Sequence, residues 1–211
     1  METSEIQAKI TEALKCLVKN DKILLIFDAN ERSITHMLAL YLWQQFYPEY
    51  CVDCEYNRNL IPDLDTDLIN HKNKQLRKRI FQGKEQVCTD DTDGKTVFPD
   101  IIIHKRCSKN NLIAIEVKKT TSQKNSLIYD ERKLKEYLES RLNYAYSLFI
   151  NVKTLSQKER DNVSRDSSEE IGIECLKMKK KTRNVDYKTP KDLKESINKE
   201  TLEKLCAKSK S

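Results

Sequence analysis

The chain has 211 residues, enough for one domain with a substantial apolar core. Charged residues make up 34% of it and apolar residues 38%, but the apolar residues cluster in runs, which excludes a disordered chain. The net charge of +6 lies mainly in residues 151–211, which hold 16 Lys and Arg against 11 Asp and Glu, whereas residues 1–150 hold 23 against 22. Such a basic segment suits a polyanionic partner, although solubility explains it equally well.

Membrane association and oxidised cysteines are both disfavoured. No apolar stretch is long enough to cross a bilayer, and the first residues lack the apolar segment of a signal peptide. Seven cysteines, an odd number at irregular spacing, are typical of reduced thiols in a cytoplasmic protein. Cys51 and Cys54 form a CxxC pair, but on a predicted strand this odd spacing points them to opposite faces, which argues against a zinc site.

The N-terminal segment predicts a helix followed by a short apolar run. Apolar residues recur at helical spacing over residues 4–18, and either Thr3 or Ser4 is a suitable N-cap. The run over residues 22–27 fits either a strand or the end of a helix.

A second helix and a first strand are predicted next. Asn30 is a suitable N-cap for a helix that extends to about Phe46 and is ended by Pro48. Residues 51–57 alternate apolar and polar side chains, as a half-buried strand does. Residues 60–95 give no clear pattern; they contain an acidic cluster (Asp63, Asp65 and Asp67), a basic cluster around Arg77, and a turn at Asp93-Gly94.

The rest of the chain predicts four strands and two helices. The strands cover residues 97–104, 111–119, 144–152 and 171–178. The first two are joined by a link short enough for a hairpin. One helix covers residues 130–142 with Asp130 as its cap, and a final helix opens at Thr189-Pro190 with Leu193, Ile197 and Leu205 on one side. The whole order indicates a mixed α/β fold in which helices cover a central sheet.

The strand over residues 111–119 carries the first chemical signal. Glu116 and Lys118 are two residues apart and therefore point to one face of the sheet. The apolar residues between and before them point to the other face. A carboxylate and an ammonium on a buried strand incur a desolvation cost, which a metal ion with its substrate would offset.

A second carboxylate is expected beside Glu116. Asp100 follows Pro99 at the start of the apolar strand that forms the other half of the predicted hairpin. Two converging carboxylates make a site for Mg²⁺ or a similar hard cation such as Mn²⁺. Lys118 beside them is placed to orient or deprotonate a water molecule, which completes the set needed for metal-assisted phosphodiester hydrolysis.

This pattern, Pro99-Asp100 followed by Glu116-x-Lys118, resembles the PD-(D/E)xK nuclease superfamily and its restriction-endonuclease-like fold. The local sequences VDCEYNR, PDIIIHKR and NLIAIEVKK look like small prokaryotic members. The resemblance implies a nuclease core over residues 30–152. An N-terminal helix and lead-in (1–29) and a basic C-terminal extension with a strand and a helix (153–211) belong to the same globular unit.

The resemblance also implies roles for individual residues. Asp100 and Glu116 correspond to metal ligands, with the Val117 carbonyl as a third, and Lys118 acts on the attacking water. The superfamily often adds an acidic residue from its first core helix, and Glu31 fits that position. The alternative for Glu31 is a carboxylate placed favourably at a helix N-terminus, and we favour the functional interpretation.

Some polar residues have weaker claims on the site. Glu55 and Arg58 either line the site or belong to a solvated strand face. His36 is more readily explained as a core or surface histidine than as a group near the metal, and His104, at the far end of its strand, as structural.

Basic residues form the candidate contacts with nucleic acid. Lys133, with Tyr137 on the same helix face, could touch phosphate, although a solvent-facing role is slightly favoured. A candidate clamp for the nucleic-acid backbone is the run Lys177, Lys179, Lys180, Lys181 and Arg183, although such runs are usually solvated.

The favoured function is a Mg²⁺- or Mn²⁺-dependent endonuclease, acting on DNA rather than RNA, in phage defence or a mobile element. A homodimer is a reasonable assembly, since many enzymes of this fold pair to cut both strands. The alternative is a catalytically inactive module of the same fold that binds nucleic acid or a protein partner. A third hypothesis, an inhibitor in a virus–host conflict, has no specific support in the sequence.

Overall fold

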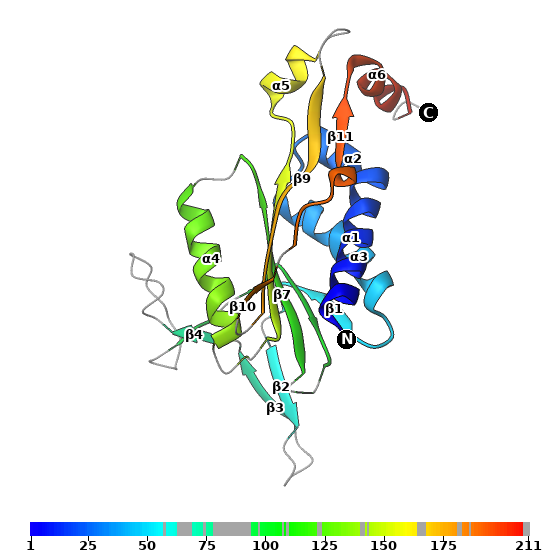
Figure 1. Ribbon diagram of the computed structural model, residues 1–211. Helices are drawn as coiled ribbons and strands as arrows, with labels where there is room; N and C mark the ends of the chain where they lie inside the picture. Colours follow the sequence, from blue (N-terminus) through cyan, green and yellow to red (C-terminus); the bar gives the residue numbers. More distant parts are fainter. Residues whose placement is uncertain are drawn as a thin grey trace.

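The computed structural model describes most of the chain. The described residues are 1–56, 58–62, 69–73, 75–77, 94–96, 98–106, 108, 110–121, 124–139, 142, 144–163, 168–180, 183–185 and 187–208. They form a mixed α/β fold built around a seven-stranded mixed sheet (Figure 1). In the described part of the chain, no helix is both long and apolar enough to cross a membrane.

The main sheet has the order β1-β6-β7-β8-β9-β10, with β11 paired to the remaining part of β9. Strand β7 lies antiparallel to β6 and parallel to β8, and the other pairs are antiparallel. The strands are β1 (Cys51–Cys54), β6 (Ile101–His104), β7 (Asn111–Lys119), β8 (Tyr146–Lys153), β9 (Glu169–Lys180), β10 (Arg183–Val185) and β11 (Lys194–Ile197). The parallel pair requires a crossover, and α4 (Lys124–Glu139) supplies it.

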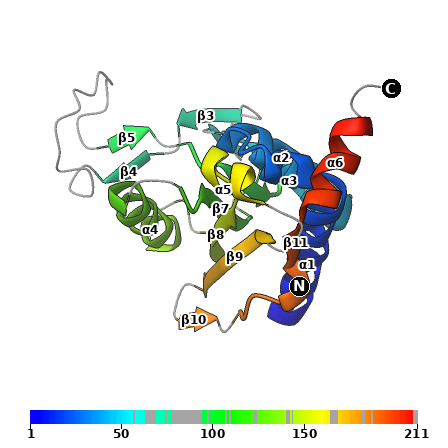
Figure 2. The same cartoon turned by 90° about the horizontal axis from the view of Figure 1, so that it is seen from above.

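Helices cover both faces of this sheet (Figures 1 and 2). Helix α4 packs on one face, whereas α1 (Thr3–Asn20), α2 (Lys22–Ile26) and α3 (Glu31–Phe46) pack on the other. The remaining described elements are α5 (Gln157–Asn162), α6 (Lys199–Lys208) and two small hairpins, β2 (Arg58–Pro62) with β3 (Ile69–Asn73) and β4 (Gln75–Arg77) with β5 (Gly94–Thr96).

The two faces of the sheet differ in composition. The face under α1 and α3 is a continuous apolar core, whose members include Ile10, Leu14, Leu17, Leu38, Ile113, Ile115, Val117 and Ile150. The face under α4 has a smaller apolar cluster, with Ile102, Ala114, Leu134, Tyr137, Leu138, Leu142, Tyr144 and Phe149. On β7 the alternation of side chains puts Glu116 on this second face, where charged groups take the place of further apolar contacts.

Most of the predicted elements are confirmed. The helices over residues 4–18 and 30–46 and the hairpin of β6 and β7 lie where the pattern places them. Asn30 caps α3, because its side chain accepts a hydrogen bond from the Ser33 N–H at 2.8 Å. Cys51 and Cys54 lie on opposite faces of β1 and are free thiols.

The predicted caps at the other two helix starts are wrong. Helix α1 has Glu2 at its N-cap position, and the Thr3 hydroxyl instead lies 2.9 Å from the Tyr146 hydroxyl. Helix α4 begins at Lys124, so Asp130 lies inside it rather than at its end. Tertiary partners outweigh the local capping preference at both positions, since Asp130 pairs with lysines instead of a helix terminus.

The secondary structure of two apolar segments differs from the prediction or was left open by it. The run at 22–27 is the short helix α2, whose Leu25 and Ile26 are buried. The predicted helix opening at Thr189-Pro190 is instead a 3₁₀ turn (Lys191–Leu193), strand β11 and then α6. Residues four apart lie on one side of a helix and also on one side of a strand, so the burial of Leu193 and Ile197 fits both. The segment is a strand because it pairs with the free edge of β9.

Gly172 makes that pairing possible. Its φ is +127°, and a Cβ at this position would lie 2.1 Å from the Leu193 carbonyl oxygen. Only glycine therefore allows the 3₁₀ turn to approach β9 this closely. The acidic cluster of residues 63–67 and the turn residue Asp93 lie outside the described residues.

Candidate active site

The first predicted carboxylate lies where β6 begins. Asp100 directly precedes Ile101, and its Oδ2 accepts a hydrogen bond from the Val117 N–H at 2.8 Å. The N–H and C=O of a strand residue point to the same side of the strand. The Val117 carbonyl therefore also points toward the residues that precede the start of β6. Burial raises the pKa of Asp100, and the bond from Val117 and the nearby Lys133 and Lys118 only partly oppose it.

Glu116 is the most deeply buried charged group of the site, with 1% of its surface exposed. Its Oε1 lies 2.8 Å from Lys133 Nζ and accepts a hydrogen bond from the Tyr137 hydroxyl at 3.2 Å. Both partners come from α4. Burial raises the pKa of Glu116 to about 8, although the adjacent Lys133 works in the opposite direction.

Lys118 lies between two carboxylates from different helices. Its Nζ is 2.7 Å from Glu31 Oε1 at the start of α3 and 3.5 Å from Asp130 Oδ2 on α4. Burial works to lower the pKa of Lys118, but the hydrogen bond to Glu31 and the charge of Asp130 outweigh it, so the pKa is raised. Lys118 is therefore held as an ammonium with a defined position.

These contacts join into an alternating chain of charges. Glu31, Lys118, Asp130, Lys133 and Glu116 follow one another, each within 3.5 Å of the next. We call this set, together with the neighbouring Asp100, the site cluster. It contains four carboxylates and two ammonium groups, a formal charge of −2 when all are ionised.

Two carboxylate oxygens of the site cluster are buried without a hydrogen bond. They are Glu116 Oε2 and Asp130 Oδ2, and the second of these still has the Lys118 ammonium 3.5 Å away. A buried acceptor without a donor is destabilising by about 1–3 kcal/mol, and such groups are uncommon in folded proteins. Together with the net charge, these oxygens make the cluster chemically suited to one divalent cation.

The described residues contain no ready-made group of three or more His, Cys, Asp or Glu side chains around a metal position. Ammonium groups occupy the space between the carboxylates instead. The donor set nevertheless fits a hard cation, since it consists of oxygens with an excess of negative charge. Asp100, Glu116 and the Val117 carbonyl are the groups that would hold it.

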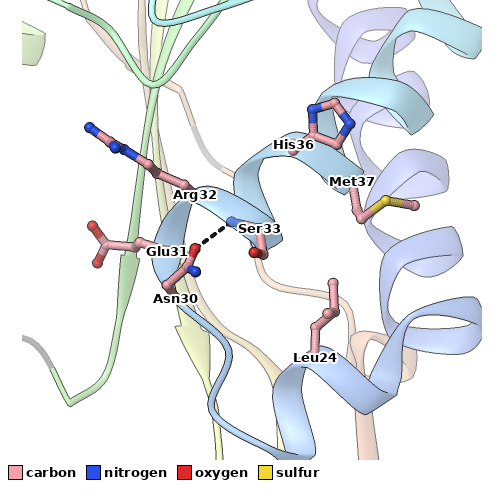
Figure 3. Close-up of a pocket in the computed structure, with 7 residues that line it drawn as sticks. All are labelled: Leu24, Asn30, Glu31, Arg32, Ser33, His36 and Met37. Carbon is pink, nitrogen blue, oxygen red and sulfur yellow. Dashed lines mark hydrogen bonds between the residues drawn. The ribbon is translucent and has the colours of Figure 1, made fainter.

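The start of α3 brings Glu31 into the site but not His36. Figure 3 shows Glu31 and Arg32 extending from the first turn of α3 toward the strands, whereas His36 extends away on another side of the helix. His36 is exposed. These residues border an open hollow beside the site, lined by Leu24, Asn30, Glu31, Arg32, Ser33, His36 and Met37.

Glu55 lies at the rim of the site. Its backbone N–H donates to the Asp100 carbonyl at 3.2 Å, and its φ is +47°. Its half-exposed carboxylate lies 3.0 Å from Arg32 Nε. The Glu55 side chain is thus paired with Arg32 at the surface and not with the buried groups of the site cluster. The side chain of Arg58 lies outside the described residues.

The predicted basic contacts divide into two groups. Lys133 and Tyr137 both contact Glu116, so the solvent-facing role favoured for them is wrong. Lys179 and Lys180 pair with Ser147 and Tyr146, toward the end of the sheet away from Lys118. Lys181 lies outside the described residues.

A second ionic cluster lies on the same sheet face, at the other end of β6. Asp53 Oδ2 lies 2.7 Å from His104 Nε2 and accepts a hydrogen bond from Arg106 Nε at 3.1 Å, while its Oδ1 accepts one from the Arg106 guanidinium. Burial works to raise the pKa of Asp53, but these partners hold it well below its usual range. His104 is 4% exposed and has a structural partner, as predicted for it.

Asp130 is the site residue that sequence reasoning missed. Local preference predicts a helix cap at this position, because Asp is common at N-caps. One signal was available: Asp130 and Lys133 are three residues apart on a helix, so their side chains lie on one face with the apolar Leu134 and Tyr137. Charged residues on the buried face of an amphipathic helix are uncommon and indicate partners.

Comparison of the whole chain with protein-family models, with curated protein sequences and with solved structures finds no match.

Proposed function

We propose that this chain is a Mg²⁺- or Mn²⁺-dependent nuclease related to the PD-(D/E)xK superfamily. The observation that supports this most directly is the site cluster, which brings Asp100, Glu116 and Lys118 together. Its carboxylates outnumber its ammonium groups, and Glu116 Oε2 is buried without a hydrogen bond. The arrangement around it also suits a restriction-endonuclease-like core. A helix carries an acidic residue, an antiparallel hairpin carries the motif, and a helix crosses to a parallel strand.

Each residue has a role that its contacts support. A bound divalent cation would supply Lewis-acid stabilisation of charge on the scissile phosphate and an activated water molecule. Asp100, Glu116 and the Val117 carbonyl would bind it, and the hydrogen bond from Val117 N–H fixes the Asp100 carboxylate for that purpose. Glu31 and Asp130 position the Lys118 ammonium, which orients the attacking water and stabilises developing negative charge.

Purified wild type and Lys118→Ala test the proposal. Both are incubated with plasmid, linear duplex DNA, single-stranded DNA and structured RNA in Mg²⁺, Mn²⁺ or EDTA. We expect metal-dependent cleavage, preferentially of DNA, that falls by about 10²–10⁴-fold in the variant. Lys135→Ala is the matched control, because Lys135 is an exposed lysine on α4 paired only loosely with Glu139 at 3.8 Å. Equal cleavage by wild type and Lys118→Ala would remove Lys118 from the mechanism.

A non-catalytic binding module of the same fold is the second candidate. One observation favours it: ammonium groups already contact Glu31, Glu116 and Asp130, so these carboxylates have counter-ions without a metal. Titration of wild type with Mn²⁺ in a calorimeter separates the two functions. Absence of binding at millimolar Mn²⁺, with nucleic-acid binding retained, would favour the binding module.

A further inference from the structure

Lys133 is an unusual lysine. Only 8% of its surface is exposed, although lysine is among the residues least often buried. Its Nζ lies 2.8 Å from Glu116 Oε1 and 3.3 Å from Asp130 Oδ1, and 5.7 Å from the centre of the Tyr129 ring. Its long side chain is therefore bent into the site cluster, where it provides a positive charge to two carboxylates.

Lys133 and Lys118 have different positions in the cluster. Lys118 comes from a strand, and its ammonium contacts Glu31 and Asp130. Among the described residues, Lys133 is the one whose ammonium contacts Glu116. Lys133 thus occupies the coordination space of the carboxylate that the proposed function assigns to the metal.

An ammonium and a divalent cation cannot share this space. Two positive charges within about 4 Å repel each other by several kcal/mol in a partly buried site. Glu116 Oε2 and Asp130 Oδ2 remain without hydrogen bonds, so acceptor capacity is left over even with the lysine in place.

We propose that Lys133 is a resident counter-ion, which occupies the position of a divalent cation at Glu116 and leaves Glu116 when that cation binds. The released ammonium, still anchored on α4, then becomes available to a phosphate group of the nucleic acid. This inference rests on the proposed function. It assigns Lys133 two alternative partners, Glu116 in the metal-free protein and substrate phosphate in the metal-bound protein.

Metal affinity of a Lys133→Met variant tests the exchange. Mn²⁺ binding is measured by calorimetry at pH 8 for wild type, Lys133→Met and the control Lys135→Met, in which an exposed lysine of the same helix is replaced. Removing the competing ammonium is expected to lower the Kd of Mn²⁺ by about tenfold, or 1.4 kcal/mol. The control is expected to bind Mn²⁺ as wild type does. The melting temperature in EDTA is expected to fall in Lys133→Met only, because Glu116 loses its counter-ion.

Lysine labelling of the wild type provides a test that needs no variant. An amine-reactive acetylating reagent is applied with and without Mn²⁺, and the modified lysines are quantified by mass spectrometry. Labelling of Lys133 is expected to rise severalfold with Mn²⁺, while labelling of Lys135 stays constant. If Lys133→Met fails to fold, Lys133→Gln, which keeps a hydrogen-bond donor for Glu116, replaces it in the calorimeter.

The outcomes separate this inference from the proposed function. Wild type that binds no Mn²⁺ would overturn both. A different result would overturn the exchange alone and leave the metal-dependent nuclease standing. In that case wild type binds Mn²⁺, neither Lys133→Met nor Lys133→Gln binds it more tightly, and labelling of Lys133 stays constant.

Discussion

Two ionic clusters share the α4 face of the sheet, and they differ in how completely their charges are paired. In the Asp53 cluster, His104 and Arg106 together contact both oxygens of one carboxylate. In the site cluster, four carboxylates share two lysines, and two buried oxygens have no hydrogen bond. The same sheet face thus carries one cluster whose carboxylate oxygens all have partners and one cluster with two oxygens that lack a hydrogen bond.

The difference bears on the proposed function, which assigns the site cluster to a metal ion and leaves the cluster of Asp53, His104 and Arg106 to the fold. A saturated buried carboxylate contributes to stability, because both of its oxygens keep partners after leaving water. An unsaturated cluster with excess charge destabilises the protein unless something else binds there. Variants of each cluster should therefore separate effects on stability from effects on activity.

The largest expected effect is on cleavage by Glu116→Gln. Gln cannot provide an anionic ligand, so the cleavage rate should fall on the order of 10³-fold, or about 4 kcal/mol of transition-state stabilisation. The free energy of unfolding should change by less than about 2 kcal/mol, since the change also removes a buried charge. Plasmid cleavage and urea unfolding measure the two quantities. A variant that cleaves normally would contradict the site assignment.

Leu38→Ala should produce the largest loss of stability, because it opens a cavity on the apolar side. Leu38 is fully buried in the core between α3 and the sheet. Truncation of such a residue lowers the free energy of unfolding by about 2–5 kcal/mol. Cleavage by the folded fraction at low temperature should stay within a few-fold of wild type. Equal stability of Leu38→Ala and wild type would contradict the assignment of the core.

Asp53→Asn should lower the free energy of unfolding by about 2 kcal/mol at pH 7, because charge-assisted hydrogen bonds are lost. The folded-state pKa of Asp53 lies below its unfolded value, so its contribution is fully present above about pH 5 and declines as the pH falls further. The difference from wild type should therefore stay constant from pH 7 to about pH 5 and shrink from about pH 5 to about pH 3 in urea titrations. Cleavage should be unchanged, and its loss would show that the two clusters are coupled.

Lys177→Ala should have the smallest effect. Lys177 Nζ lies 2.7 Å from Glu131 Oε1, but both side chains are about half exposed. Surface pairs of this kind contribute about 0–1 kcal/mol, so the thermal midpoint should move by no more than a few degrees. If Lys177→Ala lowered the free energy of unfolding as much as Asp53→Asn does, solvent exposure would not explain which ion pairs on this face stabilise the protein.

The spacing of residues in the sequence was sufficient for most of the elements and for the placement of Glu116 and Lys118 on one face of a strand. Apolar periodicity located α1, α3, β7 and β8, because burial of one face imposes a fixed period on a helix or a strand. The same alternation placed Glu116 and Lys118 on one face and Ile115 and Val117 on the other. Asn30 and Pro48 set the bounds of α3 through local backbone chemistry.

Only the tertiary structure decided what depends on distant partners. Asp130 is a cap by local preference and a site residue by its contacts with Lys118 and Lys133. Ile197 has the spacing of a helix but lies in a strand, because the edge of β9 offers it a ladder of hydrogen bonds. Periodicity records which side chains are buried, whereas the identity of the group that meets each of them depends on how elements far apart in the chain pack together.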